Sequence, residues 1–292
     1  MSTTQLSAAD GPLLSGRGRI AGVMGWPVAQ SRSPRLHGYW LRLHGIDGTY
    51  IPLSVRPEHF ATALRALPLL GFAGANVTVP HKEVALAVVD RSDATARRIG
   101  AVNTIVVASD GTLDGRNSDG FGFMENLRAG ISGWSPRAGP AVILGAGGSA
   151  RAIAVALLDG GAPEIRIVNR TVERAERLNA DIGGPFRIYG WADRASALAD
   201  AALLVNSTTL GMKGQPPLEL VLDRLPTTAV VNDIVYSPLE TTLLATARAR
   251  GNPVVDGLGM LLHQARPGFA AWFGVEPEVT PELRRFVLEA PA

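Results

Sequence analysis

Apolar and polar positions alternate regularly in the second half of the chain. Short apolar runs of strand length are each followed by a segment with helical spacing. The expected strands are 141–144, 164–168, 186–189, 203–205, 229–233 and 253–255, and the expected helices are 148–159, 171–180 and 239–250, with a weaker helical signal at 193–199. Strands that alternate with helices in this way predict a parallel, doubly wound sheet.

The first half has apolar runs in a less regular order. The expected strands are 19–24, 49–53, 74–79, 102–108 and 113–116, and the expected helices are 35–43, 58–67 and 82–89. The turn Ser109-Asp110-Gly111-Thr112 contains the Asp-Gly pair typical of a hairpin, so the strand after it should run antiparallel to the strand before it. A mixed α/β sheet is therefore predicted for this part.

Two connections define the expected domains. A helix near Asp119 leads out of the mixed sheet, and helices at 258–272 and 281–289 follow the last strand of the parallel sheet. These last helices should return to cover the first domain, and Pro267 should kink the first of them. The expected organisation is a disordered tail at 1–17, a mixed-sheet domain at 18–120 plus 258–292, and a parallel-sheet domain at 121–257.

The bulk composition excludes several classes of protein. The 292 residues are 46% hydrophobic, enough for a full core, and the net charge of +2 comes without a dense Lys/Arg run interleaved with aromatics. There is no cysteine, and the five histidines lack zinc spacing. No apolar run could span a bilayer, and the N-terminus has no signal-peptide pattern. We expect a cytoplasmic protein without metal, nucleic-acid or membrane partners; its oligomeric state stays open, with a homodimer as one alternative.

The stretch at residues 76–83 carries the most suggestive chemistry of the first domain. Pro80 cannot continue a sheet ladder, and a helix should begin at Lys82. Thr78 and Lys82 thus flank a strand-to-helix turn, a common position for chemistry in α/β proteins. Lys82 is one of two lysines in a chain that otherwise uses arginine. It is either a solvated surface lysine or an amine retained for proton exchange.

Asp119 has two interpretations. It should cap the helix that leaves the first domain. Its carboxylate could instead lie beside the Lys82 amine, where the carboxylate would raise the pKa of the lysine and burial would lower it. The sequence leaves open which effect is larger.

A glycine-rich loop follows the first strand of the second domain. Gly145-Ala146-Gly147-Gly148-Ser149-Ala150 reads G-x-G-x-x-A between an expected strand and an expected helix. Such glycines let the backbone approach a pyrophosphate, and the helix N-terminus supplies N–H groups for its charge. This setting favours a dinucleotide site over an empty glycine turn.

The end of the next strand indicates which dinucleotide is bound. Asn169-Arg170-Thr171 stands where an NAD site has a carboxylate for the ribose 2′-hydroxyl, and Arg174 follows one turn later. Two guanidinium groups suit a 2′-phosphate, so we predict NADP(H); the alternative is two surface charges. The polar loop at 206–212 should either contact the same cofactor or be a plain turn.

Eight sequence blocks together resemble the shikimate dehydrogenase family. They are G-x-P-x-x-x-S-x-S-P (25–34), N-V-T-V-P-x-K (76–82), G-A-V-N-T (100–104), G-x-N-S-D-G (115–120), G-A-G-G-S-A-R (145–151), N-R-T (169–171), D-I-V-Y-x-P (233–238) and D-G-L-G-M-L-x-x-Q-A (256–265). Each block alone is modest, but eight in one order are highly specific. The match covers nearly the whole chain.

The resemblance implies a reversible, NADPH-dependent reduction of 3-dehydroshikimate to shikimate, in the biosynthesis of aromatic amino acids. It implies a Rossmann-type NADP domain, a separate substrate domain, and Lys82 and Asp119 as the catalytic pair. The further residues that it implies are Ser31, Ser33 and Tyr236 at the substrate carboxylate, Thr78, Asn103, Asp119 and Gln264 at the ring hydroxyls, and Ile234 and Gly257 near the nicotinamide. Hydroxyl and amide groups suit a polyhydroxy carboxylate, and an ammonium can stabilise and protonate a developing alkoxide.

The sequence departs from the family pattern at three places. Gln30 stands where the family usually has histidine, and Ser118 stands where it usually has threonine. Both changes keep polar character. After Gln264 the family often has A-A-H, and here the chain reads Ala265-Arg266-Pro267, which should affect packing more than chemistry.

Two other functions compete with this interpretation. One is a quinate/shikimate dehydrogenase with relaxed substrate or NAD use, against which the Ser31 and Ser33 pair and the Asn169-Arg170-Thr171 run argue. The other is a non-catalytic, dehydrogenase-like sensor, which should lack Lys82 or Asp119 and gain a DNA-binding segment.

Overall fold

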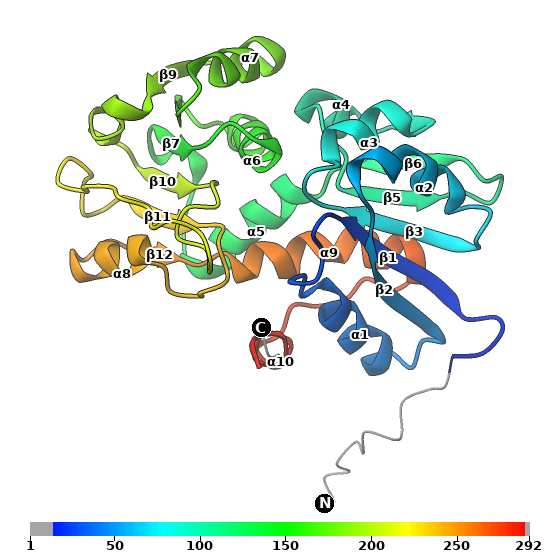
Figure 1. Ribbon diagram of the computed structural model, residues 1–292. Coiled ribbons are helices and arrows are strands. Elements are labelled where there is room, and N and C mark those ends of the chain that lie inside the picture. Colours follow the sequence, from blue (N-terminus) through cyan, green and yellow to red (C-terminus); the bar gives the residue numbers. More distant parts are fainter. Residues whose placement is uncertain (1–13, 290–292) are drawn as a thin grey trace, which may run out of the picture. The chain divides into compact units, whose positions relative to one another are not determined.

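The computed structural model describes residues 14–289, which form two compact units (Figure 1). Unit 1 contains the described residues of Met1–Asp93, then Val102–Arg116 and the chain from Ala265 onward; unit 2 contains Ala94–Ala101 and Asn117–Gln264. Each unit has its own six-stranded sheet. Residues 1–13 of the expected tail lie outside the described part. Just after them, the backbone N–H of Ser15 donates to the Asp47 carboxylate at 3.0 Å.

The sheet of unit 1 is mixed, as predicted. Its order is β2-β1-β3-β5-β6-β4, and its strands are β1 (Arg19–Gly25), β2 (Gly48–Ser54), β3 (Phe72–Val77), β4 (Arg91–Ser92), β5 (Thr104–Val107) and β6 (Leu113–Arg116). β1 runs parallel to β2 and β3, whereas β5 runs antiparallel to both β3 and β6. The hairpin expected from the Asp-Gly turn is therefore confirmed.

Helices cover this sheet and close its aromatic core (Figure 1). They are α1 (Ser33–Leu43), the 3₁₀ turn η1 (Pro57–His59), α2 (Phe60–Ala66), α3 (Lys82–Val88), the end of α9 (Leu258–Phe273) and α10 (Pro281–Leu288). The buried rings of Trp40 on α1 and Phe269 on α9 lie 5.3 Å apart, and the indole N–H of Trp272 donates to the Ile105 carbonyl at 2.8 Å. The expected return of the C-terminal helices to the first sheet is confirmed. Pro267 lies inside α9 and does not end it.

Unit 2 has the parallel, doubly wound sheet that the alternation predicts. Its order is β12-β11-β10-β7-β8-β9 with every pair parallel, and its strands are β7 (Ala141–Leu144), β8 (Ile165–Asn169), β9 (Phe186–Gly190), β10 (Leu203–Asn206), β11 (Val230–Asp233) and β12 (Val254–Val255). Its helices are α4 (Ala94–Ile99), α5 (Asp119–Gly130), η2 (Pro136–Ala138), α6 (Gly148–Asp159), α7 (Val172–Ile182), η3 (Trp191–Asp193), η4 (Ser196–Leu198), α8 (Thr242–Ala249) and the start of α9.

Both faces of this second sheet are buried. Along β7, Ala141 and Ile143 pack into one core with residues of α5, α6 and α7, whereas Val142 and Leu144 pack into another with residues of α8. This follows from the two-residue period of a strand, which sends successive side chains to opposite faces. The nearly continuous apolar character of these strands is the sequence signature of that double burial.

The strand order fixes where unit 2 can bind a ligand. The chain winds from β7 outward through β8 to β9, then returns to the other side of β7 with β10. A crevice opens outside the carboxyl ends of the two strands at such a switch point, and open α/β sheets bind ligands there.

Several expected elements need correction. The third strand ends at Val77 and not at residue 79, and the helix expected at 58–67 is a 3₁₀ turn followed by α2. The helical signal at 193–199 corresponds to the short 3₁₀ turns η3 and η4. The short elements β4 and α4 are not predicted from the sequence at all. They are too brief for a hydrophobic period to be visible.

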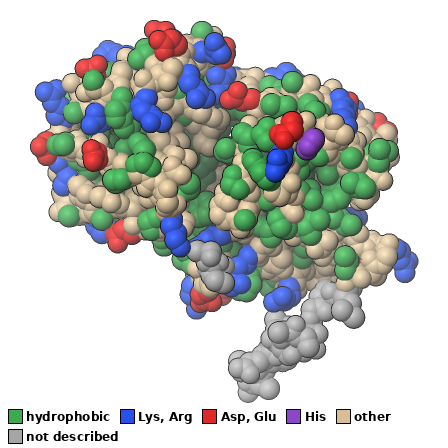
Figure 2. Space-filling model, viewed as in Figure 1, with side chains coloured by type: hydrophobic (Ala, Val, Ile, Leu, Met, Phe, Trp, Pro, Cys, Tyr) green, Lys and Arg blue, Asp and Glu red, His purple; other side chains and the backbone are tan. Residues whose placement is uncertain are grey.

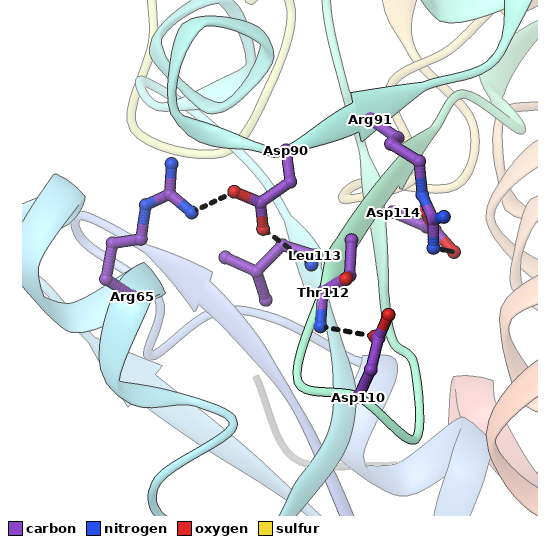
Figure 3. A network of polar contacts seen from close by, with 7 residues as sticks. All are labelled: Arg65, Asp90, Arg91, Asp110, Thr112, Leu113 and Asp114. Carbon is purple, nitrogen blue, oxygen red and sulfur yellow. Dashed lines mark hydrogen bonds and ion pairs between the residues drawn. The ribbon is translucent and has the colours of Figure 1, made fainter.

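A network of hydrogen bonds and ion pairs lies on the surface at the edge of the unit 1 sheet (Figure 3). The Asp90 carboxylate accepts from the Arg65 guanidinium at 2.5 Å and from the Leu113 backbone N–H at 2.8 Å. On β4 and β6, Arg91 pairs with Asp114 at 2.7 Å. The hydrogen bond from Arg65 is the main cause that lowers the pKa of Asp90. Because these charges are largely exposed, the network orients the edge more than it stabilises the unit.

Charges of both signs are scattered over the surface. On the face shown in Figure 2, Lys and Arg side chains lie among Asp and Glu, with apolar side chains between them. Within residues 14–289, no helix combines the length and apolarity needed to cross a bilayer, and no group of His, Asp and Glu could hold a metal ion.

Candidate active site

In unit 1, the predicted residues gather at one edge of the sheet. Strands β1 and β3 run parallel and β5 runs antiparallel to β3, so the carboxyl ends of β1 and β3 and the start of β5 share that edge. The residues that follow or precede these strand ends are Ser31 and Ser33 after β1, Thr78 and Lys82 after β3, and Asn103 before β5.

The turn between β3 and α3 is held at both ends. The Thr78 backbone N–H donates to the Met24 carbonyl at 2.9 Å, and the His81 N–H donates to the Thr78 carbonyl at 2.9 Å. The Lys82 carbonyl accepts from the Val102 N–H at 2.9 Å, and Lys82, the first residue of α3, is half-buried. A fully solvated lysine, which the sequence alone allowed, is therefore not what the fold produces.

His81 anchors the start of α3. Its Nε2 lies 2.8 Å from the Val55 carbonyl oxygen, and its ring stacks on Phe60 with a centroid distance of 4.2 Å. Burial lowers the pKa of His81, and the contact with the Val55 carbonyl opposes this shift. The His81 ring therefore holds the position of the helix that begins with Lys82.

The loop after β1 carries the two predicted serines. Gly25 ends β1 where a Cβ would lie only 2.4 Å from the Thr78 Cγ2 atom, so the two loops approach closely. The Trp26 N–H donates to the Val79 carbonyl at 3.1 Å. Ser33 begins α1, is buried, and its N–H donates to the Ser31 Oγ at 3.3 Å.

In unit 2, Asp119 and Gln264 lie on two closely packed helices. A Cβ on Gly122 of α5 would come within 2.5 Å of the Gln264 Cβ on α9. Asp119 begins α5 one turn before Gly122 and is buried. Its predicted capping role is wrong: Ser118 is the N-cap of α5, and the Asp119 backbone N–H donates to the Asn117 Oδ1 at 3.0 Å. The Asn117 side chain therefore serves the start of α5.

The glycine-rich loop lies at the switch point of the parallel sheet. Gly145 has φ +106°, and a Cβ there would lie 2.9 Å from the Ser207 Oγ, so this position requires glycine. Gly147 is the N-cap of α6 and has open space around the place of a Cβ. The loop residues Ala146, Gly147, Gly148 and Ser149 are half-buried. Open space at a helix N-terminus fits the close approach of a pyrophosphate.

The two predicted cofactor arginines lie on the surface beyond β8. Thr171 is the N-cap of α7, and the Asn169 Nδ2 donates to its carbonyl at 2.7 Å, which shapes the turn. Arg170 and Arg174 are exposed on this turn and on the first turn of α7. Both arginines are therefore accessible to solvent near the end of β8.

The ends of β11 and β12 approach each other at Gly257. A Cβ on Gly257 would lie 2.2 Å from the Ile234 carbonyl oxygen, so no other residue fits without movement of the backbone. Tyr236 follows on the same loop and is half-buried.

Asp233 holds the loops after β10 and β11. Its carboxylate accepts from the Asn206 Nδ2 at 3.0 Å, from the Val235 N–H at 3.0 Å and from the Thr241 hydroxyl at 2.7 Å. Burial raises the pKa of Asp233, and the three hydrogen bonds oppose this shift. The polar loop at 206–212 is thus fixed by its own Asn206 rather than being a loose turn.

Comparisons with known proteins agree with this geometry. The family model "Shikimate dehydrogenase substrate binding domain" matches residues 23–105, and "Shikimate / quinate 5-dehydrogenase" matches residues 136–211. A relative from Paramagnetospirillum magneticum, named shikimate dehydrogenase (NADP(+)), is 64% identical over 94% of this chain and 100% of its own length. The chain belongs to the shikimate dehydrogenase family.

Solved structures of the shikimate dehydrogenase family share the fold. Shikimate 5-dehydrogenase from Thermus thermophilus, in complex with NADP(H) and shikimate, is 36% identical with a TM-score of 0.82 over 92% of this chain and 98% of that chain. Quinate dehydrogenase from Corynebacterium glutamicum, in complex with NAD, is 30% identical with a TM-score of 0.85 over 94% of this chain and 99% of that chain. The common fold therefore accommodates more than one substrate and cofactor.

Several residues that hold other residues in position were not identified from the sequence. They are Tyr50, Asn76, Thr104, Asn117, Gly122 and Asp233. Four of these residues lie inside the sequence blocks, namely Asn76, Thr104, Asn117 and Asp233. Only their hydrogen-bond partners in the structure show which neighbouring residues they position. A polar residue within an otherwise apolar strand, such as Asn76 in β3, is the one signal that could have drawn attention to them.

Proposed function

We propose that this chain catalyses the reversible, NADPH-dependent reduction of 3-dehydroshikimate to shikimate, in the biosynthesis of aromatic amino acids in the cytoplasm. The observation that carries the proposal is the gathering of Ser31, Ser33, Thr78, Lys82 and Asn103 at one sheet edge of unit 1. Hydroxyls, an amide and an ammonium are the groups that a polyhydroxy carboxylate with a reducible ketone requires. The family membership supports the same activity.

Lys82 and Asp119 are the proposed catalytic pair. Bound NADPH supplies the hydride. Charge develops on the substrate carbonyl oxygen during reduction, and the Lys82 ammonium stabilises that charge and donates the proton. The Asp119 carboxylate accepts a hydrogen bond from the reacting hydroxyl.

The remaining residues orient the two ligands. We assign Ser31, Ser33 and Tyr236 to the substrate carboxylate, and Thr78, Asn103 and Gln264 to the ring hydroxyls. The residues that we assign to cofactor binding are Gly145, Ala146, Gly147, Gly148, Ser149, Asn169, Arg170, Thr171, Arg174, Ile234 and Gly257. These residues fit NADP in two ways. Gly145 and the open space at Gly147 offer room for the pyrophosphate. The exposed Arg170 and Arg174 offer cations for the 2′-phosphate.

An absorbance assay tests the proposal. Purified protein is supplied with shikimate or quinate, each with NADP or NAD, and formation of the reduced nicotinamide is followed. The highest kcat/KM is expected for shikimate with NADP. Comparable kcat/KM values for quinate with NAD would favour a quinate/shikimate dehydrogenase with relaxed substrate or NAD use. The similarity to the quinate dehydrogenase structure supports testing this alternative. No absorbance change in any of the four mixtures would favour the non-catalytic sensor.

A further inference from the structure

A buried chain of hydrogen bonds runs behind Asn103 in unit 1. The Tyr50 hydroxyl donates to the Asn76 Oδ1 at 2.6 Å. The Asn76 Nδ2 lies 3.2 Å from the Asn103 backbone carbonyl and 3.3 Å from the Thr104 Oγ1, and the Thr104 hydroxyl donates to the Asn103 Oδ1 at 2.9 Å. We propose that Tyr50, Asn76 and Thr104 are positioning residues that make Asn103 a hydrogen-bond donor to the substrate. This inference rests on the proposed function, in which Asn103 contacts a ring hydroxyl.

One backbone carbonyl sets the direction of every bond in this chain. A carbonyl oxygen can only accept, so the Asn76 atom next to the Asn103 carbonyl must be the Nδ2 amide nitrogen. Reversal of the Asn76 amide would place two acceptors 3.2 Å apart. The Oδ1 of Asn76 therefore faces Tyr50, and the Tyr50 hydroxyl must donate to it.

The same reasoning continues to Asn103. The second hydrogen of Asn76 Nδ2 points to the Thr104 Oγ1, which accepts it. The single hydroxyl hydrogen of Thr104 is then available for Asn103, so the Asn103 atom 2.9 Å away is the acceptor Oδ1. The amide of Asn103 consequently directs its Nδ2 hydrogens away from Thr104. The Thr104 hydroxyl thereby determines which of the two Asn103 amide atoms, Oδ1 or Nδ2, is directed toward it.

The residues of this hydrogen-bond chain are buried. Tyr50 and Asn76 are each 6% exposed, Thr104 is 2% exposed and Asn103 is 1% exposed. A buried polar atom without a partner costs about 1–3 kcal/mol. Each hydrogen bond therefore fixes the direction of the one that follows it. Tyr50 is itself fixed by His37, whose ring stacks on it at a centroid distance of 3.9 Å. Burial raises the pKa of Tyr50 well above its usual range, so its hydroxyl keeps the proton that it donates.

The chain also connects Asn103 with the rest of the unit 1 edge. Asn76 and Thr104 are paired across β3 and β5. The Asn103 carbonyl receives a second hydrogen bond, from the Val77 N–H at 2.8 Å, at the point where β3 leads to Thr78. The amide orientation and the strand end that carries Thr78 are thus set by the same contacts.

The test removes one donor with little change of shape. Thr104→Val deletes the hydroxyl, Thr104→Ser keeps it, and Thr62→Val is the matched control on the exposed surface of α2. Thr104→Val should raise the KM for shikimate about tenfold, because a charge-neutral hydrogen bond to substrate is no longer oriented. The KM for NADP should stay unchanged, Thr104→Ser should remain within about twofold of the wild type, and Thr62→Val should behave as the wild type.

A double-mutant cycle separates positioning from general damage. If Thr104 acts through Asn103, the KM increase of Thr104→Val should largely disappear when it is measured in an Asn103→Ala background. Tyr50→Phe, with Tyr39→Phe as its control, should give a smaller increase in the KM for shikimate, of about threefold. This second pair also serves if Thr104→Val fails to fold.

Three outcomes would overturn the inference. The first is a KM for shikimate that Thr104→Val and Tyr50→Phe leave unchanged in folded protein. The second is an equal loss in the Asn103→Ala background, and the third is a loss that Thr104→Ser does not restore. Failure of the proposed function is distinguishable, because the wild type itself would then give no NADP-dependent absorbance change with shikimate, and no KM could be compared among the variants.

Discussion

Lysine 82 combines a rare residue type with a constrained position. It is one of two lysines in the chain, and it begins α3 half-buried, directly after a turn that two backbone hydrogen bonds close. Arginine could supply the charge there, but its pKa is too high for it to give up a proton. The choice of lysine therefore indicates proton transfer rather than charge alone.

Substitution of this lysine should affect turnover more than binding. Lys82→Ala is expected to lower kcat by at least about a hundredfold with a much smaller change in the KM for shikimate, because proton donation acts in the transition state. Lys82→Arg should remain strongly impaired for the same reason. The control is Lys213→Ala, which removes the other, exposed lysine. Near-normal turnover of Lys82→Ala would remove the residue from the mechanism.

His37 should make the protein sensitive to acid. Burial lowers the pKa of His37 to about 3, and Asn76 offsets only part of this effect. Among the described residues, neither ring nitrogen has a hydrogen bond of normal length and angle. Between pH 6.5 and 3 the unfolded chain binds a proton that the folded chain refuses, so stability falls as the pH falls, by about 2 kcal/mol at pH 5.

Urea unfolding at pH 7 and pH 5 measures this effect. Between pH 7 and pH 5, His37→Leu should lose less stability than the wild type. His59→Leu, at an exposed position, should lose as much stability as the wild type. Equal losses in the wild type and in His37→Leu would show that other groups cause the acid sensitivity.

At the scale of elements, the proposed cofactor residues lie at strand ends and helix starts. The loops after β7, β8, β10, β11 and β12 all lie at the carboxyl edge of the parallel sheet. Glycine occurs there for two different reasons. Gly145 supplies a positive φ, and Gly257 allows the loops after β11 and β12 to approach.

The turn between β8 and α7 should decide the cofactor. Arg170→Ala is expected to lower the ratio of kcat/KM for NADP over NAD by at least about tenfold, because the 2′-phosphate loses a charged partner. The kcat with saturating NADP should change little. Arg177→Ala, further along the exposed surface of α7, is the control. An unchanged ratio in Arg170→Ala would contradict the assignment of the 2′-phosphate site.

The loop contact at Gly257 should not tolerate a side chain. Gly257→Ala places a Cβ 2.2 Å from the Ile234 carbonyl oxygen, so the backbone must move and stability should fall by about 1–3 kcal/mol. Gly38→Ala, inside α1 with open space around its Cβ, should instead raise stability slightly, by up to about 1 kcal/mol. Thermal melting of both variants measures the difference, and equal melting temperatures would contradict the crowding at Gly257.

The whole molecule consists of two units with unlike sheets, one mixed and one parallel. The regular alternation of strands and helices predicted the second sheet almost residue by residue; β7 and α6 have their expected bounds. The Asp-Gly hairpin predicted the antiparallel part of the first sheet. The site residues stay predictions, because their roles depend on ligands and on measurements.

Cofactor binding should stabilise the folded chain. NADP at one hundred times its Kd should raise the free energy of unfolding by about 2.7 kcal/mol, because it binds only the folded state. A thermal melt with NADP and with NAD at equal concentration measures this, and a larger shift with NADP is expected. A shift that is equal for both dinucleotides would contradict the predicted preference.

The sequence alone determined the fold class, the family and the residue types of the site. Hydrophobic period and short motifs are local properties, and local properties can be read along a chain. Only the tertiary structure decided which atoms hold one another. Asn117 and not Asp119 serves the start of α5, and Tyr50, Asn76 and Thr104 meet behind Asn103 from three different strands. Tyr50, Asn76 and Thr104 are distant from one another in sequence. Their pairing follows from burial, which leaves each polar atom only the few neighbours that the fold brings to it.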